Sequence, residues 1–259
     1  MAGFSVEFLG TCACDFSPKL TGEFKDKFDL DARRASSVLV NGNILIDCGP
    51  HCCNSLDIIK KDYSEITDIF ITHLHSDHFD IDNIKRIAKS KQEPLRLWIR
   101  EDAAVPRMRN VRTHRMIRQA EYAVCGGITA VSLSANHDPK AFPQWILLKN
   151  GKKKMLYALD GAWFTTGTYN YLKKSRLDLF VADATVGDYE GDYRMAEHNS
   201  IPMIRLMLPS LKKTEIISEK TKIILSHIAP SLHKPHSETE KIAAEFGAAA
   251  AYDGMKIRI

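Results

Sequence analysis

The sequence contains no long apolar run and no large excess of charge of one sign. No stretch approaches the roughly 18 apolar residues that a membrane-spanning helix needs, so no membrane partner is expected. The opening residues, MAGFSVEFLG, lack the basic start and apolar centre of a secretory signal peptide. A formal net charge of +4 over 259 residues is too small to indicate nucleic-acid binding by itself. It would favour a small anionic substrate if the cations gather at a cleft.

Low-complexity tracts, flexible linkers and short repeats are also missing, and we therefore expect one domain over residues 1–259. Without an export signal, a cytoplasmic protein with reduced thiols is expected. The six cysteines are Cys12, Cys14, Cys48, Cys52, Cys53 and Cys125. Cys12 and Cys14 form a Cys-x-Cys pair, at which we expect no additional zinc.

Short segments rich in β-branched or aromatic residues alternate with segments of helical periodicity. Strands are expected at 4–9, 37–41, 43–48, 68–72, 95–99, 128–134, 145–149, 154–159, 178–183, 222–226 and 255–259. Helices are expected at 80–90, about 101–121 with a break, 165–175, 199–212 and 236–247, the last with a capping box from Ser237 to Glu240. Hairpin-like pairs beside strand–helix–strand units predict an α/β fold of two mixed sheets covered by helices.

The stretch IFITHLHSDHFD, residues 69–80, concentrates metal-binding side chains between an expected strand and an expected helix. His73 and His75 are two residues apart near the end of an extended segment, so their side chains can point the same way. Asp77 and His78 are adjacent and tend to diverge, so each pair can serve a separate metal ion. Imidazole and carboxylate groups are suitable ligands for zinc, iron or manganese. Strand-to-helix loops are common places for active sites in layered α/β proteins.

This His-x-His-x-Asp-His order resembles the signature of the metallo-β-lactamase-fold hydrolases. The resemblance implies a four-layer αββα sandwich and a site with two divalent metal ions, for which zinc is expected first and manganese or iron as alternatives. Members of the family complete the site with a later histidine, a bridging aspartate and a final histidine at strand ends. This sequence offers His137, Asp160 and His227, each directly after an expected strand.

By the same resemblance, the ligands divide between two ions that share a bridging hydroxide. Asp160 would bridge the ions, and the remaining ligands would form two sets, His73, His75 and His137 on one ion and Asp77, His78 and His227 on the other.

Other segments resemble the phosphodiesterases of this superfamily, namely RNase Z and the phosphoribosyl 1,2-cyclic phosphate phosphodiesterases. These segments are VEFLGT at 6–11, RRASSVLVNGNILIDCGP at 33–50 and YDGMKIRI at 252–259. The class B β-lactamases usually place a cysteine on the second metal, whereas this sequence has Asp160. We therefore predict a metal-dependent phosphoric diester hydrolase that acts on a small cyclic phosphate or nucleotide phosphodiester.

Other residues have predicted roles around this centre. His198 matches a family histidine that protonates the leaving group, so it is the expected general acid. Asp77 is expected to be needed for catalysis because it holds one of the two metal ions. Asp183 would orient His198 or a ligand histidine, or would simply occupy a strand-end turn. Arg33 or Arg34 would clamp a substrate phosphate, with a surface position as the alternative for at least one of them.

Several alternatives remain open. An RNase Z-like RNA-processing nuclease and a metal-binding protein without catalytic activity are the rival functions, and a homodimer is left open. Residues 105–118, VPRMRNVRTHRMIR, carry five arginines. They would form a solvated helix face or, as the rival interpretation, a patch for substrate phosphate or nucleic acid. Nucleic acid is the less favoured partner.

Overall fold

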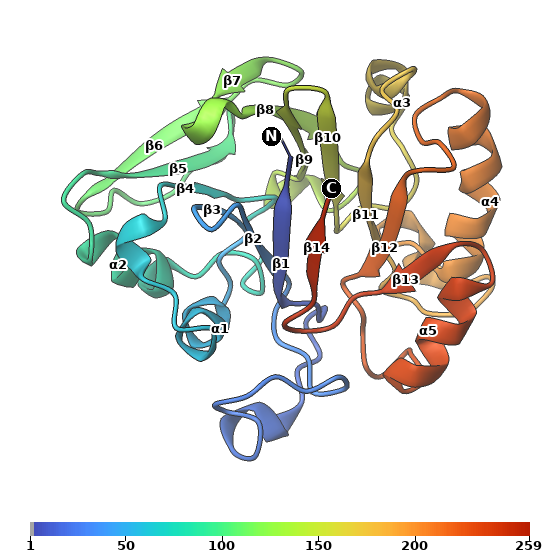
Figure 1. Cartoon of the computed structure of the whole chain (residues 1–259), viewed down its shortest axis with the longest axis horizontal. Coiled ribbons are helices and arrows are strands. Elements are labelled where there is room, and N and C mark those ends of the chain that lie inside the picture. The colour runs from blue at the N-terminus through green and yellow to red at the C-terminus, as the bar shows by residue number, and fades with distance from the viewer. Residues whose placement is uncertain (1–2) are drawn as a thin grey trace.

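A computed structural model describes residues 3–259, in which the strands form two seven-stranded sheets that face each other (Figure 1). The first sheet has the strand order β14-β1-β2-β3-β4-β5-β6, and the second has the order β13-β12-β11-β10-β9-β8-β7. The strands of the first sheet are β1 (Ser5–Gly10), β2 (Ser37–Val40), β3 (Ile44–Ile46), β4 (Asp68–Phe70), β5 (Leu95–Arg100), β6 (Val111–Met116) and β14 (Lys256–Arg258). Those of the second are β7 (Glu121–Ala123), β8 (Thr129–Ser134), β9 (Gln144–Asn150), β10 (Lys153–Ala158), β11 (Leu179–Asp183), β12 (Lys222–Ser226) and β13 (Ala248–Ala250).

Both sheets are mixed. In the first sheet β14, β1, β2 and β3 pair antiparallel, and β3 to β6 pair parallel. In the second sheet β7 to β10 pair antiparallel, and β10 to β13 pair parallel. The parallel strands of each sheet therefore end at a common edge, where the loops after them can share one site.

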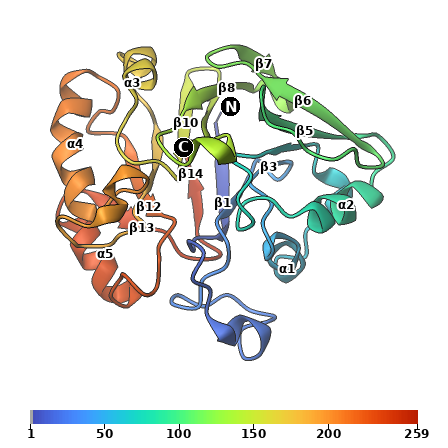
Figure 2. The ribbon, with the colours of Figure 1, turned by 180° about the vertical axis from the view of Figure 1, so that it is seen from behind.

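Helices cover the outer face of each sheet (Figure 2). On the first sheet these are α1 (Cys52–Ile58) and α2 (Ile81–Lys89), and on the second they are α3 (Thr166–Leu172), α4 (Ile201–Lys213) and α5 (His236–Ala244). Short 3-10 turns lie at Pro18–Thr21, Tyr63–Glu65, Cys125–Gly127, Pro139–Ala141 and Tyr193–Ala196. This arrangement confirms the predicted four-layer αββα sandwich.

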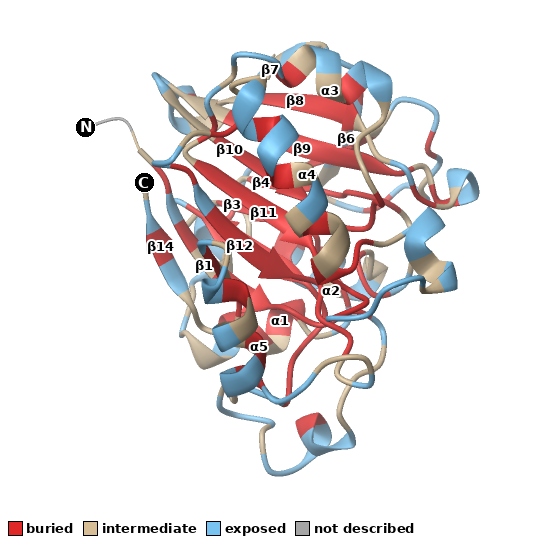
Figure 3. Ribbon diagram, turned by 90° about the vertical axis from the view of Figure 1, so that its right-hand side faces the viewer, coloured by how far each residue is buried: buried red, intermediate tan, exposed pale blue. Residues whose placement is uncertain are grey.

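Three apolar clusters fill the spaces between the layers. One lies between the two sheets and joins side chains such as Val38 and Ile46 with Leu148 and Val181. The other two lie under α1 and α2 and under α3 to α5. Figure 3 shows the result, with buried strands in the centre and exposed outer faces on the helices.

Helix α2 begins and packs as its sequence predicts. The Asp80 side chain caps it by accepting hydrogen bonds from the backbone N–H groups of Asp82 and Asn83, at 2.9 Å each. Ile84, Ile87 and Ala88 form its buried stripe. The cap and the stripe fix where the helix starts and which way it faces, and this holds the metal-binding loop that precedes it.

The predicted helix at 101–121 is wrong. Residues 111–116 form β6 and residues 121–123 form β7, while α1 and β13 were not predicted at all. β6 is an edge strand that pairs with β5 from Leu95↔Val111 to Arg100↔Met116. Pairing with a neighbouring strand determines its structure here, against the local sequence preference.

The predicted capping box at Ser237 is also wrong. Helix α5 starts at His236 after Pro235, and no side chain caps it. Glu240 instead accepts a hydrogen bond from the backbone N–H of Ala250 at 2.5 Å, which ties α5 to β13.

None of the helices between residues 3 and 259 combines the length and apolar character that crossing a membrane requires.

Candidate metal centre

The loop between β4 and α2 is held in place by the segment after β3. The N–H of Cys48 donates to the carbonyl of His78 at 2.9 Å, and the N–H of Asp80 donates to the carbonyl of Cys48 at 2.8 Å. Within the loop, His78 and Phe79 both donate their N–H groups to the carbonyl of His75, at 3.0 and 2.9 Å. These bonds turn the chain so that its polar side chains converge.

Gly49 makes this close approach feasible. A Cβ atom at this position would lie 1.8 Å from the carbonyl oxygen of Asp77. We expect Gly49→Ala to lower the free energy of unfolding by about 3 kcal/mol, the upper end of typical overpacking costs, because the metal-binding loop must move. Urea denaturation measures the change. Gly22→Ala is the matched control, since nothing lies within 4 Å of a Cβ there. Equal stabilities of the two variants would contradict this interpretation.

The seven predicted ligands come together from both sheets. They lie at the carboxyl ends of β4, β8, β10 and β12, and the structure places their ligand atoms around one site: His73, His75, Asp77, His78, His137, Asp160 and His227.

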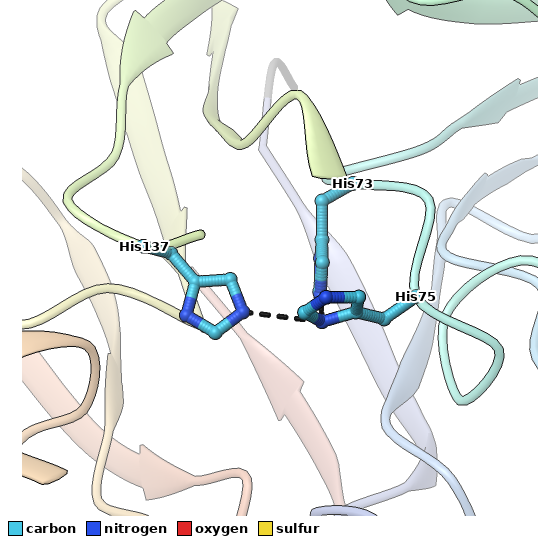
Figure 4. Close-up of side chains that lie close together, drawn as sticks. All are labelled: His73, His75 and His137. Carbon is cyan, nitrogen blue, oxygen red and sulfur yellow. Dashed lines mark hydrogen bonds between the residues drawn. The ribbon is translucent and has the colours of Figure 1, made fainter. Parts of the chain in front are cut away.

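One set consists of three histidines. His73 Nε2 lies 3.0 Å from His75 Nδ1, and His137 Nε2 lies 3.2 Å from that same His75 atom. Figure 4 shows the three rings pointing toward one another. Converging imidazole nitrogens at such distances can hold a cation between them.

The second set contains Asp77, His78 and His227. The Nε2 atoms of His78 and His227 are 3.2 Å apart, and Asp77 Oδ2 lies 3.3 Å from the first and 3.7 Å from the second. This set is more deeply buried than the first, since His78 is 0% and His227 2% exposed, whereas the side chain of His75 is 41% exposed.

Asp160 lies between the two sets. Its Oδ2 is 2.9 Å from His78 Nε2 and 3.0 Å from His227 Nε2, while its Oδ1 is 3.9 Å from His73 Nε2 and 3.8 Å from His137 Nε2. Among residues 3–259, no donor makes a well-aligned hydrogen bond to this buried Oδ2. A buried carboxylate oxygen without such a donor, surrounded by imidazole nitrogens, fits a bound cation.

Three residues of the site have left-handed backbone conformations that favour glycine. They are Asp47, Asp160 and His227, with φ values of 64°, 48° and 59°. Such conformations cost of order 1–3 kcal/mol each and concentrate at functional sites. The backbone strain lets the side chains of Asp160 and His227 turn back into the site directly after their strands.

Buried hydrogen bonds orient the ligand histidines. Asp47 Oδ2 lies 2.7 Å from His78 Nδ1, and Thr185 Oγ1 lies 2.8 Å from His227 Nδ1. Thr72 Oγ1 donates to Asp47 and lies 3.1 Å from His73 Nδ1. Partners of this kind fix the tautomer and direction of a metal-ligating ring. Asp47, Thr72 and Thr185 were not predicted as site residues, although Asp47 belongs to the Asp-x-Gly segment that the sequence analysis quoted.

Asp183 has the position expected of an orienting residue. Its Oδ2 is 3.2 Å from His198 Nδ1 and 3.5 Å from His227 Nδ1, and it accepts the backbone N–H of Asp160 at 3.0 Å. His198 lies over His227 with ring centroids 5.6 Å apart and an interplanar angle of 18°. The side chain of His198 is 16% exposed, so it can reach both the site and a bound substrate.

The pKa values of these groups reflect burial opposed by close charges. Burial lowers the pKa of His227, but Asp160 and Asp77 outweigh it and raise this pKa to about 10. For His198, burial lowers the pKa and the nearby Asp183 more than offsets this, so the net shift is upward. Burial and the neighbouring His78 hold the pKa of His73 well below its usual range. The site is therefore strongly electrostatically coupled.

A cavity of about 310 Å³ opens onto these groups. Besides the ligands, it is lined by residues 13–15, by the turn around 194–198 and by residues 229–232. Arg194 contributes a cation whose side chain is 29% exposed and whose ion-pair partner is Asp192, at 2.7 Å. Arg194 was not predicted as a site residue, because no recognisable motif surrounds it.

Arg33 and Arg34 do not line this cavity. Arg33 is 3% exposed, and its guanidinium donates to Thr11 Oγ1 at 2.8 Å and lies 3.0 Å from His236 Nδ1. Arg34 is fully buried, donates to Asn54 Oδ1 at 2.8 Å and lies 3.7 Å from Asp253 Oδ2. Both guanidinium groups are buried and bind partners inside the protein, which argues against the expected phosphate clamp and the alternative surface position.

Comparison with known proteins gives the fold of this chain. A family model described as anti-Pycsar protein Apyc1 matches residues 36–106, and no curated protein matches. The metallo-β-lactamase fold protein YhfI from Bacillus subtilis superposes with a TM-score of 0.76 at 14% identity, covering 99% of this chain and 100% of that one. A diphosphatase of the PhnP family gives 0.73 at 18% identity, covering 100% and 98%. The short form of human tRNase Z, ELAC1, gives 0.65 at 20% identity, covering 98% of each chain.

The chain therefore has the metallo-β-lactamase fold, as its His-x-His-x-Asp-His order predicted.

Proposed function

We propose that this protein is a metal-dependent phosphodiesterase that hydrolyses a small cyclic phosphate or a nucleotide phosphodiester. The observation that carries the proposal is the position of Asp160, whose two oxygens face two separate sets of ligand atoms. One carboxylate shared by two ligand sets suits a hydrolytic site with two closely spaced metal ions.

The ligand sets suit divalent ions that accept nitrogen and oxygen donors, with zinc expected first and manganese or iron as alternatives. His73, His75 and His137 would hold one ion, Asp77, His78 and His227 the other, and Asp160 both, in line with the distances within each set. Such a pair of ions supplies Lewis acidity toward phosphoryl oxygens and an activated water near neutral pH.

The remaining steps belong to the side chains of the protein. His198 lines the cavity beside the ligands and would donate a proton to the leaving oxygen as general acid. Asp183 would hold the ring of His198 in position through Nδ1. Arg194, which lines the same cavity, would attract the anionic substrate.

Two considerations favour phosphorus as the electrophile. Two structures that share this fold are, by name, a diphosphatase and a tRNase. The cavity of about 310 Å³ is at the small end of the range for ligand sites, which favours a small phosphodiester. An RNase Z-like nuclease is the second candidate, because the tRNase Z structure covers 98% of this chain.

A substrate panel tests the proposal. We expect the metal-loaded protein to hydrolyse bis(p-nitrophenyl) phosphate and either a cyclic nucleotide or phosphoribosyl cyclic phosphate, and to act weakly on structured RNA, a thioester and a β-lactam. Cleavage of structured RNA alone would favour the nuclease. Hydrolysis of only the thioester or the β-lactam would disprove the assignment to phosphodiesters.

The substitution His198→Ala tests the general-acid role of this residue without removing a proposed metal ligand. We expect kcat for a 2′,3′-cyclic nucleotide to fall by about 10²–10⁴-fold, because its alkoxide leaving group needs a proton. The loss should be much smaller for bis(p-nitrophenyl) phosphate, whose leaving group is stable as an anion. His114→Ala is the control, since His114, on β6, stacks against Trp98 of β5 and lies outside the cavity. An equal loss for both substrates would contradict the acid role of His198.

A further inference from the structure

A second concave surface lies outside the candidate metal centre, at the edge of the first sheet. It is a hollow of about 710 Å³ between the carboxyl half of α2 and the loop before β6. Residues 107–110 also line an adjoining hollow of about 750 Å³ that extends to Arg112. We call the two hollows together the cationic groove, and its charged lining residues are Lys85, Lys89, Lys91, Arg107, Arg109 and Arg112.

The cations of this groove are largely uncompensated. Lys85 pairs with Asp82 at 3.1 Å. Within residues 3–259, no carboxylate lies within 4.0 Å of the charged groups of the other five. Glu93 is the only acidic residue between positions 85 and 95, and positions 103 to 118 contain none. The formal charge of the whole protein is only +4, so this concentration is local.

The floor of the groove is fixed by buried contacts. Asn110 Nδ2 donates to the carbonyl of Ala88 at 2.9 Å and to that of Lys91 at 3.0 Å. Met108 is 5% exposed, and the N–H of Leu95 donates to the carbonyl of Asn110 at 3.0 Å. Asn110 therefore satisfies two carbonyls at the end of α2, which would otherwise repel an anion. The exposed Lys89, Arg107 and Arg109 project from this fixed floor, whereas Lys91 donates to the carbonyl of Ser64 at 2.7 Å.

The chemistry of the groove favours nucleic acid over a protein or a membrane. Protein interfaces depend on exposed aromatic or apolar anchors, and none of the large exposed hydrophobic residues among positions 3–259 lies in the groove. Membrane surfaces are recognised by flat or protruding segments that insert apolar side chains, whereas this surface is hollow. Nucleic-acid interfaces are polar and rich in cations that contact phosphates.

A hollow cationic track of this kind suits one strand better than a double helix. Double-stranded nucleic acid is usually recognised by protein helices or β-ribbons that enter its grooves. Single-stranded nucleic acid instead lies in positively charged grooves of the protein that follow the phosphate backbone. We propose that the cationic groove binds a single strand of nucleic acid through its phosphates, independently of the reaction proposed for the metal centre.

The groove is separated from the metal centre by the length of α2. This helix starts three residues after His78 and ends at Lys89, so it carries the chain roughly 13 Å away from the ligands. β6 is the edge strand of its sheet, and its amino end lies beside the end of α2 (Figure 1). A nucleic-acid strand bound in the groove would leave the cavity at the candidate metal centre free. Turnover of a small substrate should therefore not change.

Fluorescence anisotropy with labelled 12-nucleotide oligouridylate tests the proposal. With about four phosphates neutralised, log Kd should rise against log salt with a slope near 3. The variant Lys89→Glu/Arg107→Glu/Arg109→Glu should bind at least about tenfold more weakly and with a smaller slope. Lys213→Glu/Lys220→Glu/Lys241→Glu carries the same charge change at exposed positions outside the groove and should bind like the unmodified protein.

Further measurements test whether weaker binding by the groove variants results from misfolding. The milder variant Lys89→Gln/Arg107→Gln/Arg109→Gln should keep the thermal transition and show an intermediate loss of binding. Both groove variants should hydrolyse bis(p-nitrophenyl) phosphate at the unmodified rate. The proposal is overturned by equal binding in groove and control variants, by no binding at 50 mM salt, or by a preference for duplex RNA, anionic vesicles or polyglutamate.

Discussion

Replacing Asp77 by alanine is expected to abolish phosphodiester hydrolysis and to reduce the bound metal from two ions per chain to one. Asp77 Oδ2 lies 3.3 and 3.7 Å from the Nε2 atoms of His78 and His227, so it is placed to act as a carboxylate ligand of that set. Loss of an outer partner of a ligand typically costs 10–100-fold in metal affinity, and loss of a ligand itself should cost more. Elemental analysis and kcat/KM measure the two effects.

The fold should survive this change, because the backbone bonds of the loop do not involve the Asp77 side chain. Circular dichroism and urea denaturation check this. Asp82→Ala is the matched control, since the Asp82 side chain is 91% exposed in the first turn of α2. If Asp77→Ala kept two ions or normal turnover, the second ligand set would be wrong.

Removal of the metals should eliminate turnover completely, since every proposed role of the cavity depends on the charge at its centre. Dialysis against dipicolinic acid should yield an inactive protein, and zinc, manganese or iron(II) should restore activity. Calcium should not, because it prefers six to eight oxygen ligands and the site offers five histidines. The bound ions should also stabilise the fold, by about 2.7 kcal/mol at a concentration one hundred times Kd.

Turnover and urea midpoints measured before and after dialysis provide the readouts. Retained activity in protein that elemental analysis shows to be metal-free would contradict a metal-dependent mechanism. Restoration by calcium as well as zinc would contradict the ligand assignment but leave a metal requirement in place.

Much of this site could be predicted because its ligands follow strands directly. His73 to His78 follow β4, Asp160 follows β10 and His227 follows β12, and the carboxyl ends of strands in such sheets meet at one edge. The motif in residues 69–80 is local, so its meaning does not depend on contacts between distant residues. For Asp183 the same reasoning left two roles open, orienting His198 or a ligand histidine and occupying a strand-end turn, and its Oδ2 lies 3.2 Å from His198 Nδ1.

What the sequence did not reveal depends on contacts between distant residues. Asp47 and Thr185 orient histidines that lie 31 and 42 residues away, and no spacing rule predicts such pairs. Arg33 and Arg34 resembled a substrate clamp, but burial against Thr11 and Asp253 gives them a structural role.

Contacts between distant residues also determine the secondary structure of residues 111–116, which the sequence did not predict. Six residues with two arginines and only one buried side chain have little intrinsic preference for a strand. They adopt one because β5 offers a free edge, and the preceding loop is anchored through Asn110. That tertiary context also brings the arginines of segment 105–118, for which the sequence left a phosphate or nucleic-acid patch open, beside the lysines at the end of α2, and so creates the cationic groove.

The pairing of β1 with β14, in the register Ser5↔Arg258, has a consequence for biosynthesis. β1 cannot gain this neighbour until β14, near the other end of the sequence, has been translated. At roughly 5–20 residues per second, that delay is on the order of ten seconds or more. Until then one side of the nascent first sheet is open to pairing with other chains, so chaperones that shield β edges should assist this protein late in its synthesis.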